Sequence, residues 1–297
     1  MPDTTDEESR SRTVRQRALA AARCRELRIG APDGLSVSAQ EWGDSGGVDC
    51  VFIHGFLQSH LCWWNQFSNR SLTRALHMVT YDIRGHGGSD KIGNQDLYRE
   101  SGRFADELHA VISAFAMHNP ILVGWSYGTR IIADYLTKYG DRAIAGINFI
   151  GSSLSDDEDH GGPGLVFLER ALSDDFAWRL NATREFNRAC FCRPPPTPDL
   201  DQLVAISMTV PSKVRQWMRR PGSYDAVLKS VRIPVLITHG TADAIKLPGA
   251  ARYVARAVRR SELSLYAETG HSPFWEDPVR FNRELARFVR RAHANRA

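Results

Sequence analysis

The residues with the clearest potential for chemistry form a serine motif near the middle of the chain. Residues 124–128 read Gly-Trp-Ser-Tyr-Gly, with an apolar run before them and a helix-like pattern after them. A serine on a sharp strand-to-helix turn needs small residues two places away, which Gly124 and Gly128 supply. Such a turn exposes the hydroxyl of Ser126 and directs the backbone N–H of Tyr127 at a developing oxyanion. The motif predicts a nucleophile if a base and an acid exist elsewhere; a chance match in a loop is the alternative.

A histidine and an aspartate in the C-terminal third complete this chemistry. His271 lies in a loop between the last predicted strand and the last predicted helix. Asp243 directly follows the predicted strand 234–239, so both side chains should return to the same sheet edge. A serine nucleophile needs a histidine base that a carboxylate orients. We predict His271 as the base and Asp243 as the acid, with Asp156 or Asp157 as the alternative acid.

The elements that must position these residues alternate between strand and helix. Short apolar runs end at turn residues, and longer segments repeat apolar residues at helical spacing. Alternation of this kind predicts an α/β fold with a doubly wound, mostly parallel eight-stranded sheet, whose ligands bind at the carboxyl ends of the strands. The predicted strands are 27–29 and 35–39, which form an edge hairpin, and 51–57, 77–82, 121–125, 143–150, 234–239 and 263–266. The predicted helices between them are 64–76, 102–118, 127–139, 248–259 and 278–291.

One long segment breaks the alternation. Residues 152–224 contain acidic, glycine-rich and proline-rich stretches between helical patterns such as 165–172 and 200–208. We interpret this segment as an inserted helical cap on a core made of residues 26–151 and 225–297. Residues 1–25 have only a thin apolar stripe and are predicted to be a flexible tail.

The order Ser126, Asp243, His271 resembles the α/β-hydrolase superfamily. The resemblance extends from about residue 26 to the C-terminus and is strongest to the cofactor-free haloperoxidase, esterase and C–C hydrolase branch. It implies that the His-Gly-x segment after the third strand places the N–H of Phe56 in the oxyanion hole. His54 in that segment is then a structural residue.

A glycine-rich turn after the fourth predicted strand carries the same resemblance. Residues 82–89 match the Asp-x-Arg-Gly-x-Gly-x-Ser signature, whose role is loop architecture, so His86 is not expected to be catalytic. Thr129 stands where many relatives have glycine or alanine, a change expected to affect strand–helix packing. Serine at the elbow argues against epoxide hydrolases and dehalogenases, which need an aspartate there.

Composition excludes several other classes of function. The net charge is +4, and no basic run is interleaved with aromatic residues, so nucleic acid is not an expected partner. No stretch approaches the ~20 apolar residues of a membrane span. Five cysteines without a disulfide framework, and no apolar leader near the start, favour the cytoplasm. Cys190 and Cys192 with His160 lack the spacing of a zinc site, and there is no nucleotide motif, so neither metal nor cofactor is expected.

These patterns predict a serine hydrolase that cleaves a carboxylic ester, thioester or lactone. Alternatives are a C–C bond hydrolase, a cofactor-free perhydrolase or haloperoxidase, and a non-catalytic ligand receptor on the same scaffold. Trp64, Trp125 and Trp275 lie near the catalytic motifs, as does Phe56, and they either pack or line a pocket for an apolar small molecule. The sequence gives no indication of oligomeric state.

Overall fold

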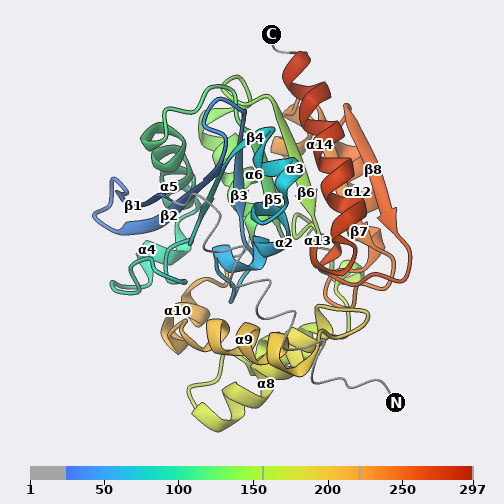
Figure 1. The fold of residues 1–297 in the computed structure, drawn as a ribbon. Helices are drawn as coiled ribbons and strands as arrows, with labels where there is room; N and C mark the ends of the chain where they lie inside the picture. The colour runs from blue at the N-terminus through green and yellow to red at the C-terminus, as the bar shows by residue number, and fades with distance from the viewer. Residues whose placement is uncertain (1–24, 156, 221, 296–297) are drawn as a thin grey trace.

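An eight-stranded sheet forms the centre of the molecule (Figure 1). The computed structural model describes residues 25–155, 157–220 and 222–295. The strand order is β1-β2-β4-β3-β5-β6-β7-β8; β2 pairs antiparallel with β1 and β4, and every other pair is parallel. The predicted fold class and the edge hairpin are therefore confirmed. The strands are β1 (Arg25–Gly30), β2 (Ser36–Gly43), β3 (Val48–Ile53), β4 (Leu76–Tyr81), β5 (Ile121–Trp125), β6 (Gly146–Ile150), β7 (Val235–Gly240) and β8 (Ser261–Tyr266).

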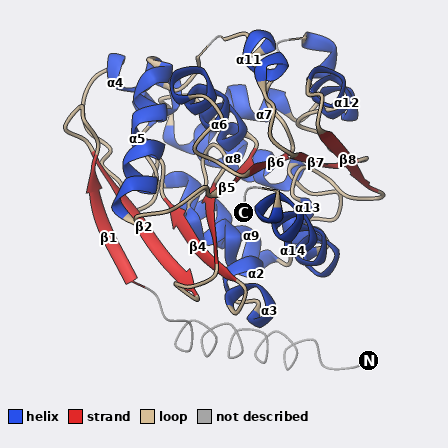
Figure 2. Ribbon diagram, turned by 90° about the horizontal axis from the view of Figure 1, so that it is seen from above, coloured by secondary structure: helices blue, strands red, loops and turns tan. Residues whose placement is uncertain are grey.

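Helices cover both faces of the sheet (Figure 2). Successive strand residues point to opposite faces, so Val51 and Ile53 join one buried cluster while Cys50 and Phe52 join the other. The first cluster includes residues of α4 (Asp96–Arg99), α5 (Ser101–Ala114), α6 (Tyr127–Tyr139), α11 (Asp225–Ser230) and α12 (Pro248–Ala257). The second includes residues of η1 (His60–Trp63), α2 (Trp64–Phe67), α3 (Arg70–Thr73), α13 (Pro273–Glu276) and α14 (Pro278–Ala294).

The segment between β6 and β7 is helical and lies below the sheet in the view of Figure 1. Side-chain hydrogen bonds join it to the core, for example from Gln58 to Asn187 at 2.8 Å. Because these helices lie at one end of the sheet, the loops at that end of the strands lie between the sheet and the helical segment. Its helices are η2 (Glu158–His160), α7 (Leu165–Arg170), α8 (Phe176–Ala189), α9 (Thr197–Met208) and α10 (Ser212–Trp217).

Two of the differences between the structure and the sequence prediction have a clear local cause. The single helix predicted over 64–76 is two short helices, because the Asn69 side chain accepts the amides of Ser71 and Leu72 and starts a new helix. Helix α8 was not predicted; two of its four buried residues are polar, Thr183 and Asn187, and it begins where Asp175 caps the amide of Trp178. The predicted tail lies outside the described residues except for Arg25, the first residue of β1.

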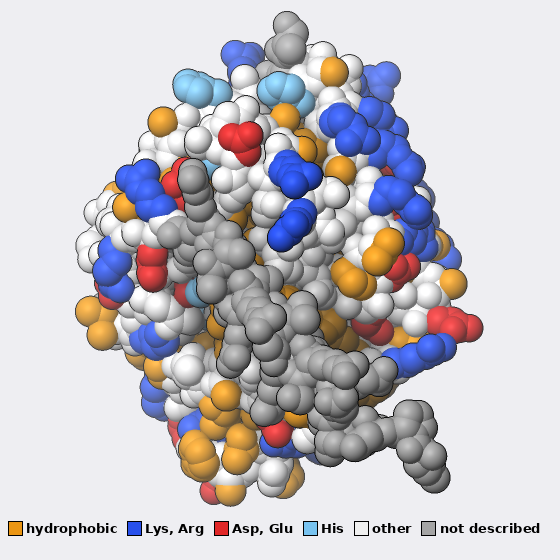
Figure 3. Space-filling view, in the orientation of Figure 1, with side chains coloured by type: hydrophobic (Ala, Val, Ile, Leu, Met, Phe, Trp, Pro, Cys, Tyr) orange, Lys and Arg blue, Asp and Glu red, His pale blue; other side chains and the backbone are white. Residues whose placement is uncertain are grey.

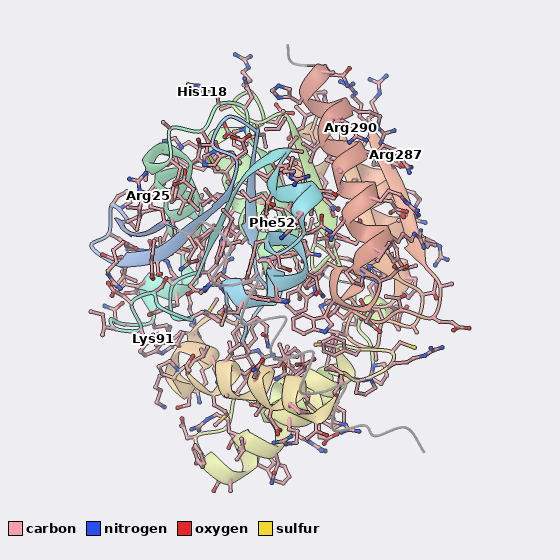
Figure 4. All side chains as sticks on the ribbon, viewed as in Figure 1. Arg25, Phe52, Lys91, His118, Arg287 and Arg290 are labelled. Carbon is pink, nitrogen blue, oxygen red and sulfur yellow. The ribbon has the colours of Figure 1, made fainter. Side chains whose placement is uncertain are left out.

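Helix α14 carries several exposed arginines. Arg283, Arg287 and Arg290 are exposed on α14, and Figure 3 shows basic side chains along that side of the molecule. Figure 4 shows Arg287 and Arg290 on the outer side of this helix, while Phe52 lies within the fold. Within the described ranges, no helix is both long and apolar enough to cross a membrane.

Candidate active site

Ser126 lies on the sharp turn between β5 and α6. Its backbone has φ 52° and ψ −112°, an unusual conformation for a residue with a side chain, and its amide donates to the carbonyl of Ile150 at 2.8 Å. The flanking glycines are required by space: a Cβ on Gly124 would lie 2.8 Å from the carbonyl oxygen of Gly128. A Cβ on Gly128 would lie 2.3 Å from the carbonyl oxygen of Ile53. The turn leaves Ser126 partly exposed, as a nucleophile requires.

Thr129 holds the same turn from the first turn of α6. Its hydroxyl donates to the carbonyl of Ser126 at 2.6 Å and accepts the amide of Ser153 at 3.1 Å. The side chain therefore ties the serine to the loop that follows β6, a link that glycine or alanine would lack.

His271 and Asp243 meet at the carboxyl ends of the neighbouring strands. Nδ1 of His271 donates to Oδ2 of Asp243 at 2.7 Å, and both side chains are buried. The other oxygen of Asp243 accepts the amides of Ile245 and Lys246 at 2.8 and 2.9 Å. Burial raises the pKa of Asp243, but His271, His239 and the Lys246 amide outweigh it, so this pKa lies below its ordinary value. A charged carboxylate is thus fixed against Nδ1 of the ring.

The end of β6 contacts both Ser126 and His271. Gly151 has φ 52°, and a Cβ on it would lie 2.9 Å from Cε1 and Nδ1 of His271. The preceding residue, Ile150, is the one that accepts the amide of Ser126. Nε2 of His271 is buried and has no hydrogen-bond partner among the described residues. Because Nδ1 is committed to Asp243, Nε2 is the ring nitrogen able to accept a proton.

Two backbone amides lie beside the serine. Gly55 packs against it: a Cβ there would lie 3.2 Å from the Cβ of Ser126. Phe56 follows Gly55, and its ring centroid is 6.0 Å from that of Tyr127, the first residue of α6. The amides of Phe56 and Tyr127 donate to no other residue in the part of the chain that is described. Both therefore remain able to bind a developing oxyanion.

His54 and His86, in the neighbouring loops, make hydrogen bonds to backbone groups. Nδ1 of His54 donates to the carbonyl of Gly55 at 2.8 Å, and Nε2 accepts the amide of Ile83 at 3.0 Å. Nε2 of His86 accepts the amide of Leu57 at 3.1 Å, a residue held at φ 62°. Burial lowers the pKa of His54 to about 4 and that of His86 to about 3. These neutral rings shape the loop that carries Phe56.

The aromatic residues near the site occupy different environments. Trp125 is only 6% exposed, its Nε1 donates to the carbonyl of His271 at 2.8 Å, and its ring centroid is 5.0 Å from that of Phe274. Trp275 is half-buried, with its ring centroid 6.2 Å from that of Phe191 in the helical segment. Trp64 is also half-buried, at the start of α2. Trp125 therefore contributes to packing around the histidine loop, and the pocket role of all three stays a prediction.

The residues of the alternative assignments have other surroundings where the structure describes them. Asp157 caps η2, where its side chain accepts the amide of Asp159; Asp156 lies outside the described residues. Cys190 is buried and Cys192 exposed. Across the described ranges, no group of three or more potential ligands could hold a metal ion. A cavity of about 470 Å³ lies between α7, α8 and α10, away from the serine, and Trp178 is among its lining residues.

Sequence reasoning missed a buried ion pair that joins α6 to the end of the helical segment. Nη2 of Arg220 lies 2.8 Å from Oδ2 of Asp134, and its Nε donates to the hydroxyl of Tyr127 at 2.7 Å. The hydroxyl of Tyr224 also donates to Asp134, at 3.2 Å. The available signal was an aspartate on the buried face of a helix, four residues after Arg130. Sequence reasoning also missed Glu276, whose carboxylate accepts the amide of Gly270, the residue before His271, at 2.8 Å.

Comparison with known proteins agrees with this geometry. The sequence model of the Alpha/beta hydrolase family matches residues 50–284. A Burkholderia cenocepacia protein assigned as an aryl esterase is 33% identical, with a TM-score of 0.87 over 91% of this chain and 100% of its own. The esterase RhEst1 from Rhodococcus sp. ECU1013 is 30% identical, with a TM-score of 0.82 over 89% and 98%. Non-heme chloroperoxidase CPO-A1 from Kitasatospora aureofaciens is 26% identical, covering 86% of this chain and 97% of its own. The branch that the motifs predict is therefore confirmed.

Proposed function

Because the chain belongs to the α/β-hydrolase family and resembles esterases within it, we propose that it hydrolyses a carboxylic ester, thioester or lactone through an acyl-enzyme. The observation that carries the proposal is the buried hydrogen bond between His271 and Asp243, which leaves Nε2 of the ring without a partner among the described residues. A base oriented in this way next to an exposed serine is the arrangement that acyl transfer needs.

In the proposed reaction, Oγ of Ser126 attacks the substrate carbonyl while Nε2 of His271 takes its proton. The N–H groups of Phe56 and Tyr127 hold the oxyanion of the tetrahedral intermediate. The bond to the leaving group then breaks, and His271 returns the proton to the departing alcohol or thiol. Water attacks the acyl-enzyme with His271 again as base, which releases the carboxylic acid and restores Ser126. Asp243 remains ionised and stabilises the imidazolium throughout.

We further propose that residues 152–224 act as a cap over the site and that the substrate is a small molecule with a substantial apolar part. Trp64 and Trp275 are half-buried, and Trp275 contacts Phe191 of the segment. Aromatic side chains of this kind bind apolar groups while excluding water.

A second candidate shares the same intermediate. The similarity to a non-heme chloroperoxidase favours perhydrolysis, in which hydrogen peroxide replaces water and the acyl-enzyme yields a peracid. The two differ only in the nucleophile of the second step, so peroxide should compete with water for one acyl-enzyme.

The test is a panel of acyl esters, thioesters and lactones, assayed with wild-type protein and Ser126→Ala, with and without peroxide. We expect turnover in at least one class and loss of it in the variant. Stoichiometric labelling of Ser126 by a fluorophosphonate, with no turnover of any substrate, would instead favour a ligand receptor. Turnover that survives in Ser126→Ala would contradict the proposed nucleophile.

A further inference from the structure

A half-buried carboxylate joins the loop of the proposed base to the helical segment. Glu276 ends α13, and its Oε1 accepts the amide of Gly270 at 2.8 Å, one residue before His271. Its Oε2 accepts the amide of Cys192 at 2.8 Å and that of Arg193 at 3.4 Å, both in the stretch that follows α8. One side chain therefore holds backbone from two parts of the molecule that are about 80 residues apart in sequence.

The same two stretches touch closely at the backbone. A Cβ on Gly270 would lie 2.5 Å from the amide nitrogen of Cys192 and 2.9 Å from the Cα of Phe191. Only glycine allows this approach, so the junction is tight. The edge contact between Phe191 and Trp275 closes one side of it.

The junction also has an exposed ion pair, between Arg193 and Glu268 at 2.9 Å. Both side chains are about 80% exposed, so solvent screens this pair and it contributes little. Glu276 is half-buried, and a carboxylate that accepts backbone amides there makes stronger, charge-assisted hydrogen bonds. Glu268 and Glu276 thus flank His271 with the same charge, but only Glu276 is held by backbone amides.

We propose that Glu276 is a positioning residue that fixes His271 by anchoring its loop to the cap, an inference that rests on the proposed function of His271 and Ser126. The carboxylate does not touch the reacting atoms. It determines where the Gly270–His271 backbone lies, and hence whether Nε2 of the ring faces the serine. The seating of the cap and the position of the base are consequently coupled through one side chain.

The test compares Glu276→Gln with Glu268→Gln. The second variant removes the same charge from the exposed glutamate that pairs with Arg193. Glutamine keeps one carbonyl oxygen, but its NH₂ group faces an amide donor, so one side of the junction loses its acceptor. Two measurements are made on the full chain: the rate at which a small alkyl fluorophosphonate labels Ser126, and hydrogen exchange of residues 190–193 and 268–272. The small reagent needs an activated serine without requiring the cap to bind an acyl chain.

We expect Glu276→Gln to slow labelling about tenfold and to speed exchange in both stretches, with Glu268→Gln close to wild type in both measurements. Glu276→Asp, which retains the charge but is too short to reach both sides, should also label slowly. Labelling of Glu276→Gln at the wild-type rate would overturn the proposal, as would failure of both variants to fold, which would make Glu276 a folding determinant. If the wild-type protein itself is not labelled, the proposed nucleophile fails, and with it the positioning of a base, while exchange still shows whether Glu276 joins the two stretches.

Discussion

The loops at the strand ends and the helical segment next to them are held in place in different ways. Ser126, Asp243 and His271 follow β5, β7 and β8, so the parallel sheet itself brings them to one edge. The helical segment instead packs apolar residues such as Phe186 and Val214 into the first buried cluster, and polar side chains fix it at particular points, among them the buried pair of Arg220 and Asp134 and the carboxylate of Glu276. The comparison implies that changes at the strand ends remove chemistry, whereas changes at the attachments alter stability, positioning and substrate range.

The largest effect should come from the nucleophile. Ser126→Ala should lower kcat/KM on the best ester by on the order of 10⁶-fold with the fold intact, because a triad without its nucleophile loses the covalent route. His271→Ala should behave similarly. Asp243→Asn, which keeps the shape but disturbs the tautomer of the histidine, should cost about 10⁴-fold. Asp157→Asn is the control, since its side chain only caps η2, and it should stay near wild type. Activity of Ser126→Ala within tenfold of wild type would contradict the proposal that the residues at the strand ends carry the chemistry.

The next effect concerns the attachment of the segment to α6. Asp134→Asn leaves the guanidinium of Arg220 buried without its charge partner, which should lower the free energy of unfolding by about 3–5 kcal/mol in urea denaturation. The matched control is Glu169→Gln, which breaks the exposed pair with Arg219 and should change stability by less than about 1 kcal/mol. Equal losses of unfolding free energy in both variants would show that the buried Arg220–Asp134 pair contributes no more to stability than the exposed pair.

A smaller effect should appear in substrate range. Each buried methylene is worth about 0.8 kcal/mol, so lengthening the acyl chain by two to four carbons should raise kcat/KM by roughly one to two decades before the pocket is full. Trp64→Ala should flatten this rise, and Trp178→Ala, on the outer side of the helical segment and 54% exposed, should leave it unchanged. An ester series from two to ten acyl carbons measures both. If acetyl and octanoyl esters react equally well in all three proteins, the aromatic residues only pack.

The same division explains what the sequence could predict. Strand periodicity and the elbow motif depend on local patterns, so the sheet could be predicted from sequence, and the contact between His271 and Asp243 followed from strand order. The junction at Glu276 depends on backbone amides far along the chain, and no local pattern encodes such a partner. The broken helix at Asn69 was a missed capping signal within a region of helical periodicity. Helix α8 buries Thr183 and Asn187 and exposes Phe176 and Trp178, so its apolar periodicity does not mark the buried face, and its cap at Asp175 was the remaining sign.

The smallest predicted effect lies at the sheet, away from both the site and the segment. His77 on β4 places Nδ1 2.6 Å from Oδ1 of Asp49 and Nε2 2.8 Å from Oε1 of Glu41, on the two neighbouring strands. Hydrogen bonding to Asp49 raises the pKa of His77, and burial, which opposes this, is outweighed with the help of Glu41. Both ring nitrogens donate only when the ring is protonated, so the folded state holds this proton more tightly than the unfolded chain does.

The sign of the pH dependence follows from that raised pKa. The contribution of His77 to stability is fully present below the unfolded value of about 6.5 and is lost as pH rises through the folded value. The difference in unfolding free energy between wild type and His77→Gln should therefore be largest near pH 6 and shrink toward pH 9. His109→Gln, at an exposed histidine that stacks on Tyr139, is the control and should show no such trend. A His77→Gln difference that grows with pH would mean that the ring is neutral in the folded protein. In that case Asp49 and Glu41 would destabilise the pairing of β2, β4 and β3 instead of stabilising it.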